Sequence, residues 1–187
     1  MVAACGAREK LGPEAYVQHL SSDESPSLIT KELNGVNYKL RLLTPEYMAL
    51  SHSRERLNKN EIMESLKNYT HQVSFVFVIE DSDKNQGRVK STVFNAEGYG
   101  NILAYANTDL KNDFMLVREH DTLYCNLVHL EPSNSLQPLI RLSLAFNIPS
   151  PAEKGFTFLF NDNIFNNGPL KFAYSNQVMD NLPKLKM

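Results

Sequence analysis

Several segments of the chain alternate apolar and polar residues with a period of two, and this pattern constrains the fold more than any other feature. Residues 36–42, 139–146, 156–160 and 170–174 each carry apolar side chains at every second position, which is typical of a strand with one buried face. Residues 73–79 are apolar almost throughout and favour a central strand. We therefore predict about seven strands separated by turns, and a mainly β (α+β) fold with an antiparallel β-sandwich-like domain.

The periodicity changes over residues 45–69, where we predict a helical insertion. Thr44, Pro45 and Glu46 are residue types favoured at the start of a helix. They predict a helix from about residue 45 to 57, followed by a second, shorter helix. Residues 88–113 leave helix and irregular structure open, because glycines interrupt an apolar pattern of helical spacing.

The composition is that of one globular domain. The chain has 187 residues, of which 42% are hydrophobic and 21% charged, and its formal net charge is −2. This balance lacks the basic excess of nucleic-acid-binding proteins, so no nucleic-acid partner is expected. The sequence contains no polybasic run of the kind that binds anionic lipid, and no apolar stretch long enough to span a bilayer.

The segment Val2-Ala3-Ala4-Cys5-Gly6 resembles the lipobox of bacterial lipoproteins. In that family a signal peptide is cleaved before the cysteine, which then carries diacylglycerol and an N-acyl chain. Small residues before the cysteine give the peptidase access to the bond. Because residues 7–34 are rich in polar and turn-forming types, we predict a lipidated N-terminal tether over 1–34 and a single β-rich globular domain over 35–187. The alternative is a free thiol at Cys5 in a cytoplasmic tail that begins at Met1.

Further segments are similar to a family of uncharacterised gram-negative envelope lipoproteins. They are Asp121-Thr122-Leu123-Tyr124-Cys125, residues 158–162 and residues 168–172. This resemblance implies a lipid anchor and a location in the cell envelope, on an outer-membrane, periplasmic or surface face. It implies no activity, and Cys5 is the one functional residue that it carries over.

Cys125 and His129 are the nearest pairing of a nucleophile and a base in the sequence. On one strand they would lie about 13 Å apart, whereas a catalytic dyad needs contact at about 3 Å. The sequence therefore favours a buried structural thiol at Cys125. His129 and Glu131 would share one strand face and could bind a metal with His120 or Asp121, although an exposed polar strand end is the favoured interpretation.

Two further patterns are weaker candidates for sites. Asp81, Asp83 and Asn85 have the alternate oxygen spacing of a calcium loop, but the glycine and the final acid of an EF-hand are missing. A solvated loop is favoured there. Asp121-Thr122-Leu123 resembles the acceptor sequence for O-glycosylation in some envelope proteins, which would modify Thr122.

Together these features predict a membrane-anchored envelope lipoprotein that acts as a binding or assembly-support module. Its expected partners are membrane lipid through Cys5 and an envelope protein or glycan, and no cofactor is expected. Two alternatives remain open at this point. One is a hydrolase that uses Cys125 or a metal near His129, and the other is a calcium-stabilised, adhesin-like module.

Overall fold

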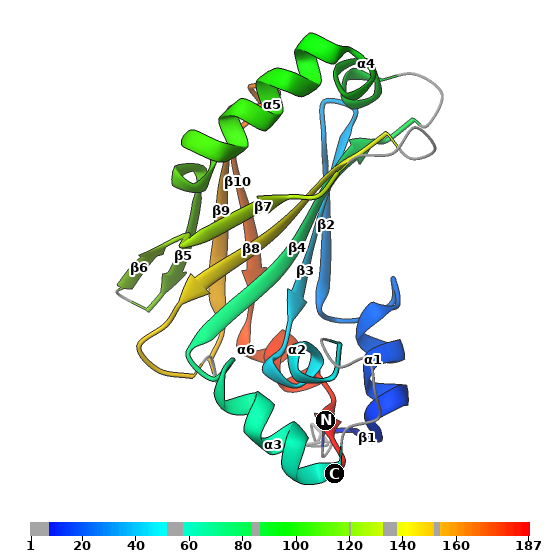
Figure 1. Ribbon diagram of the computed structural model, residues 1–187, viewed down its shortest axis with the longest axis vertical. Coiled ribbons are helices and arrows are strands. Elements are labelled where there is room, and N and C mark those ends of the chain that lie inside the picture. Colours follow the sequence, from blue (N-terminus) through cyan, green and yellow to red (C-terminus); the bar gives the residue numbers. More distant parts are fainter. Residues whose placement is uncertain (1–7, 52–57, 84–86, 120, 133–137, 152–153) are drawn as a thin grey trace, which may run out of the picture.

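Two antiparallel β-sheets packed face to face form the body of the protein (Figure 1). The computed structural model describes residues 8–51, 58–83, 87–119, 121–132, 138–151 and 154–187. Helices cover both ends of the sheets, so the fold is α+β and mainly β, as the alternating pattern predicts.

The larger sheet has five strands, in the order β2-β3-β4-β8-β7. These strands are β2 (Leu28–Leu33), β3 (Val36–Leu43), β4 (Gln72–Asp81), β8 (Ile140–Asn147) and β7 (Leu127–Leu130). The smaller sheet has four, in the order β10-β9-β5-β6. They are β10 (Gly168–Tyr174), β9 (Phe156–Asp162), β5 (Phe114–Arg118) and β6 (Asp121–Tyr124).

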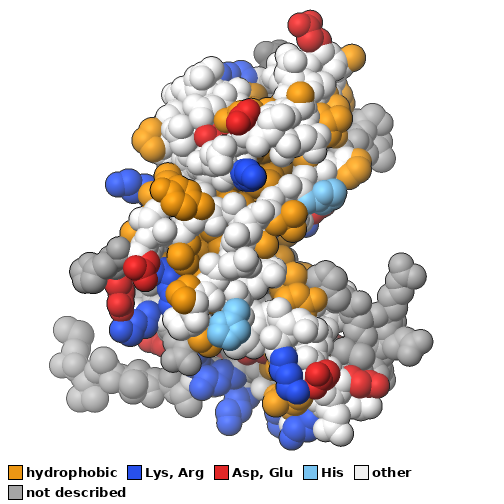
Figure 2. Space-filling view, turned by 60° about the vertical axis from the view of Figure 1, so that its left-hand side comes forward, with side chains coloured by type: hydrophobic (Ala, Val, Ile, Leu, Met, Phe, Trp, Pro, Cys, Tyr) orange, Lys and Arg blue, Asp and Glu red, His pale blue; other side chains and the backbone are white. Residues whose placement is uncertain are grey.

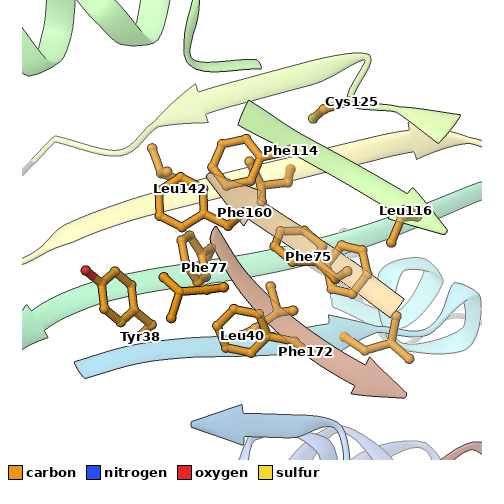
Figure 3. Close-up of a cluster of buried hydrophobic side chains, with 14 of the residues drawn as sticks. Tyr38, Leu40, Phe75, Phe77, Phe114, Leu116, Cys125, Leu142, Phe160 and Phe172 are labelled. Carbon is orange, nitrogen blue, oxygen red and sulfur yellow. The ribbon is translucent and has the colours of Figure 1, made fainter. Parts of the chain in front are cut away.

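Aromatic side chains fill the space between the two sheets (Figure 3). Phe75 and Phe77 extend from β4, the central strand of the larger sheet, and both are fully buried. Phe77 lies 5.0 Å from Phe160 between ring centroids, and Phe75 lies 5.1 Å from Phe158, both on β9 of the opposite sheet. Such edge-on and tilted ring pairs add to the stability gained by apolar burial. The alternation seen in the sequence therefore marks the inner faces of a sandwich.

The helices gather at the two ends of the sandwich, and most begin with a recognisable cap. At the lower end in Figure 1 are α1 (Pro13–Ser21), α2 (Pro45–Ser51), α3 (Lys59–Lys67) and α6 (Asn176–Asn181). At the upper end are α4 (Arg88–Phe94), α5 (Ala96–Thr108) and the 3₁₀ turn η1 (Leu110–Asp113). Asn58 and Glu61 form a reciprocal capping box on α3, and the Asn95 side chain caps α5. The predicted insertion over 45–69 corresponds to α2 and α3.

The structure places the start of the folded domain earlier than the predicted boundary at residue 35. The strand β1 (Lys10–Leu11) pairs in parallel with β11 (Lys184–Leu185), and β2 is an edge strand of the larger sheet. Tyr16 and Leu20, four residues apart on α1, are both 1% exposed. Residues 10–33 are thus part of the folded domain, and Tyr16 and Leu20 belong to its core. Any tether to Cys5 is short, because it ends where β1 begins.

The chain crosses from one sheet to the other between β6 and β7. Asn126 forms the corner: its N–H donates to the Ala145 carbonyl, and its side-chain oxygen accepts from the Asn147 N–H at 2.6 Å. The Cys125 N–H donates to the Phe114 carbonyl of the smaller sheet. This corner closes one side of the sandwich, so β6 and β7 are held close together there.

Candidate functional site

Asp81, from the predicted calcium loop, caps a helix instead of facing solvent. Its Oδ1 accepts from the Val89 N–H at 2.9 Å and its Oδ2 from the Lys90 N–H at 2.7 Å, at the start of α4. The Asp81 residue is 8% exposed. Asp83 is exposed, and Asn85 lies outside the described residues. Both carboxylate oxygens of Asp81 therefore serve backbone donors.

His129 and Glu131 lie at the end of the edge strand β7. The Glu131 carboxylate accepts from Arg141 Nε at 2.9 Å and from the Ser143 hydroxyl at 3.0 Å, both on the neighbouring β8. His129 is exposed, and His120, which the sequence offered as a further ligand, lies outside the described residues. Within the described part of the chain, no group of three His, Cys, Asp or Glu side chains is placed to hold a metal ion.

Asp121, the other candidate ligand, lines a small pocket of about 350 Å³ beside β5. The charged groups of this pocket largely offset one another. Lys154 Nζ lies 2.7 Å from Glu119 Oε1, and this contact lowers the pKa of Glu119 and raises the pKa of Lys154. Arg118 donates to the Ser150 carbonyl at 3.1 Å. The pocket therefore presents no concentrated charge of one sign.

Cys125 is a buried thiol at the corner between β6 and β7 (Figure 3). The residue is 7% exposed, and its Sγ donates to the Leu127 carbonyl at 3.1 Å and to the Ala145 carbonyl at 3.5 Å. Burial raises the pKa of Cys125 to about 11. Because the thiolate is the nucleophile, these surroundings favour an inert structural cysteine.

Thr122 is exposed on β6, the edge strand of the smaller sheet. This exposure meets the one structural condition for the predicted glycosylation, which stays a prediction. Nearby, Tyr124 and Leu127 are 66% and 57% exposed, so the corner between β6 and β7 presents apolar surface. Single exposed apolar residues are common on protein surfaces and carry no functional argument by themselves.

A cavity of about 840 Å³ lies at the lower end of the molecule. One part of its lining is apolar and includes Val73, Met179 and Leu182. Another part carries charge, from Arg8, Glu46 and Lys184. Binding sites for small molecules typically combine an apolar wall with a few polar groups at about this size. We take this cavity, here called the basal pocket, as the candidate functional site.

Hydrogen bonds fix the polar wall of the basal pocket. The Tyr16 hydroxyl lies 2.8 Å from Thr44 Oγ1 and donates to Glu46 Oε2 at 3.5 Å. Burial, with a smaller contribution from the Glu46 charge, raises the pKa of Tyr16 above its ordinary value. Tyr16 is therefore a neutral hydrogen-bonding group at physiological pH. Arg8 is paired with Asp180 on α6.

Sequence reasoning missed two buried polar clusters, and both have structural roles. Tyr38 on β3 donates to Asp162 Oδ2 at 2.5 Å and accepts from Asn167 Nδ2 at 2.6 Å, which joins the two sheets. In the second cluster, Asp113 Oδ2 accepts from the Tyr105 hydroxyl at 2.6 Å and Oδ1 accepts from Asn163 at 2.7 Å. In each cluster the hydrogen-bonding partners are far apart in the sequence or belong to a turn. The spacing of residues along the chain therefore gives no signal for these clusters.

No known family model, curated protein or solved structure matches the chain. The resemblance to gram-negative lipoproteins therefore stays a prediction, and Cys5 lies outside the described residues. None of the described helices has the length and apolar character needed to pass through a bilayer.

Proposed function

We propose that the protein is a lipid-anchored lipoprotein of the bacterial cell envelope, whose folded domain acts as a binding or assembly-support module. The observation that carries the proposal is the position of the lipobox-like Val2-Ala3-Ala4-Cys5 relative to the fold. Cys5 precedes β1 by only five residues. Even a fully extended link would keep its Cα within about 18 Å of Lys10.

A cysteine this close to the domain would hold the domain directly against the membrane. The acyl chains of a lipoprotein cysteine exceed what stable anchoring requires, since each buried CH₂ contributes about 0.8 kcal/mol. The anchored end would be the lower end of the molecule, where β1 lies in Figure 1. The basal pocket opens at this same end, and its mixed lining supports a binding role for the domain.

The two alternatives from the sequence receive less support. A hydrolase that uses Cys125 would need an accessible thiolate, and this thiol is buried with a raised pKa. A calcium-stabilised module would need Asp81 to face its neighbours in the loop, and its carboxylate instead caps α4. A ligand-binding role needs neither of these groups.

Metabolic labelling tests the anchor. Cells of the native host, grown with radiolabelled palmitate, would express the full gene product with its own leader, as wild type, Cys5→Ser and Cys125→Ala. We expect label on the wild type and on Cys125→Ala, which keeps one thiol at position 5, and none on Cys5→Ser. The labelled protein should sediment with the envelope membranes. Absence of label from the wild type, or label retained by Cys5→Ser, would overturn the proposal.

A binding role for the basal pocket is tested by thermal unfolding. A ligand that binds only the native state must raise the melting temperature. We expect Glu46→Gln, inside the pocket, to abolish a rise produced by soluble envelope glycans or short peptides, while Glu32→Gln, exposed on β2, leaves it unchanged. An equal rise in both variants would place binding elsewhere on the domain.

A further inference from the structure

Four basic residues lie on or next to the ribbon formed by β1 and β11, here called the terminal ribbon. Lys10 and Lys184 are paired in the parallel register, so their side chains lie next to each other on the same side. Arg8 and Lys186 each lie two residues away along their own strand direction, and the Lys186 N–H donates to a β1 carbonyl at 2.7 Å. Lys10 and Lys184 therefore share one face of the ribbon, while Arg8 lies just before β1 and Lys186 just after β11.

The opposite face of the terminal ribbon fixes which way the basic side chains point. Leu11 and Leu185 are partly buried and pack against the hydrophobic core. Because neighbouring residues on a strand face opposite sides, Lys10 and Lys184 are directed away from the core, with Lys184 beside the basal pocket. Lys10, Lys184 and Lys186 are all exposed.

Three of these four charges are available to a partner. Arg8 pairs with Asp180, so its charge is offset. Within the described part of the chain, no ion pair engages Lys10, Lys184 or Lys186. Like charges placed side by side repel one another. An anionic partner would therefore reduce the electrostatic repulsion between these lysines.

The basic face lies where the chain approaches its proposed lipid attachment. Cys5 is five residues from Lys10, and β1 lies with the C-terminal end of the chain at the lower pole in Figure 1. Figure 2 shows several Lys and Arg side chains gathered at this lower pole, with acidic side chains to one side of them. The basic face is thus only a few residues of chain away from the proposed lipid attachment at Cys5.

We propose that the basic face of the terminal ribbon binds the anionic phospholipid headgroups of the membrane that carries the Cys5 anchor. This inference rests on the proposed lipid anchor and adds a second, electrostatic contact to it. Basic residues near an anionic surface each contribute about 1 kcal/mol. The contact would orient the domain, with the terminal ribbon facing the bilayer and α4 and α5 directed away from it.

The experiment uses the mature chain from Cys5 onward with one synthetic acyl chain. A myristoyl-maleimide attached to Cys5 replaces the native lipids, while the buried Cys125 thiol stays unmodified at neutral pH. One myristoyl chain binds a bilayer only weakly and reversibly, so an electrostatic contribution is measurable. Partitioning is compared between phosphatidylcholine vesicles with and without phosphatidylglycerol.

The comparison is made for the wild type, a ribbon variant and a control variant. The ribbon variant is Lys10→Gln, Lys184→Gln, Lys186→Gln, and the control is Lys31→Gln, Lys111→Gln, Lys171→Gln, three exposed lysines on other elements. We expect phosphatidylglycerol to raise partitioning of the wild type and the control by on the order of 100-fold, at about fivefold per lysine. The ribbon variant should show no such preference, and added salt should reduce the wild-type preference.

The outcomes separate this inference from the proposed anchor. A wild type that partitions equally onto both vesicles would overturn the inference, as would a control variant that loses the preference as fully as the ribbon variant. Neither result bears on palmitate labelling of Cys5, because the acyl chain is attached chemically here. Circular dichroism of each variant confirms that a lost preference does not reflect lost folding.

Discussion

The contact between Asp81 and the start of α4 gives a sharp test of what this carboxylate does. Gly87, the residue at the N-cap of α4, has no side chain to accept hydrogen bonds. Asp81 supplies the acceptor from the end of β4, and its two oxygens bind the N–H groups of Val89 and Lys90. Substitution Asp81→Ala removes both bonds and leaves the Val89 N–H buried, because Val89 is 0% exposed.

The expected loss follows from the two groups that lose their partners. Removal of a helix cap costs about 0.5–2 kcal/mol, and a buried donor left unsatisfied costs about 1–3 kcal/mol. Because the two effects overlap, we expect Asp81→Ala to lower the free energy of unfolding by about 2–4 kcal/mol. Glu32→Gln, at an exposed position on β2, should change it by no more than about 0.5 kcal/mol.

Gly87 provides an independent check on the same contact. A Cβ at this position would lie 1.9 Å from Asp81 Cγ and 2.1 Å from its Oδ1. The backbone of Gly87 is extended, with φ 177°, so the cost of Gly87→Ala arises from this collision. We expect about 1–3 kcal/mol of destabilisation in the wild type, and a smaller cost when Asp81 is already Ala. The two substitutions should therefore couple by about 1 kcal/mol or more.

Urea unfolding followed by far-ultraviolet circular dichroism measures all four proteins of this cycle. A parallel melt in calcium and in chelator tests the metal alternative, and we expect equal melting temperatures. The reasoning is refuted if Asp81→Ala costs less than about 0.5 kcal/mol. It is also refuted if calcium raises the melting temperature of the wild type and this rise is lost in Asp81→Ala.

Three further measurements address the core, the thiol and the buried phenols. Phe77→Ala should lower the free energy of unfolding in urea by about 3–5 kcal/mol. Phe94 is 51% exposed, so Phe94→Ala should change the same free energy by no more than about 0.5 kcal/mol. Similar losses for the two variants would contradict the assigned core. Iodoacetamide at neutral pH should leave Cys125 unmodified in the native protein and alkylate it in urea, which peptide mass spectrometry measures. Rapid alkylation of Cys125 in the native protein would contradict the raised pKa of this thiol. Burial and the hydrogen bond to Asp113 raise the pKa of Tyr105 to about 12. The stability that the neutral Tyr105 hydroxyl contributes is therefore fully present below the pKa of tyrosine in the unfolded chain, about 10, and is lost as the pH rises toward 12. Tyr105→Phe should reduce this alkaline loss, and an unchanged pH profile would count against the shift.

The strands were the most predictable part of the fold because their burial pattern is local. Residues 73–79 predict β4, which the structure extends to Gln72–Asp81. The helices over 88–113 were harder, because Gly98 weakens a helix by propensity. In the structure a Cβ at Gly98 would lie 2.7 Å from the Thr92 carbonyl. The glycine is therefore needed for the close approach of α4 and α5, a tertiary reason that the sequence does not display.

Composition does not predict the structure of the first 34 residues correctly. Their polar and turn-forming residues predict a tether, yet Tyr16 and Leu20 bury one face of α1. Pro13 at the first position of α1 was the available signal, since proline is favoured there. The candidate site was less predictable still. The basal pocket combines Arg8, Glu46 and Lys184 from three distant segments, and the sequence contains no basic run that marks the terminal ribbon.

The pairing of β1 with β11 also sets an order of events during synthesis. Residues 10–11 are made early, but they have no strand partner until residues 184–185 emerge. A chain already attached to the bilayer at Cys5 would therefore wait, with an unpaired first strand, until residues 184–185 are made. Only a chain that extends through these residues can complete the closure, so the membrane contact would distinguish such molecules from ones truncated before them.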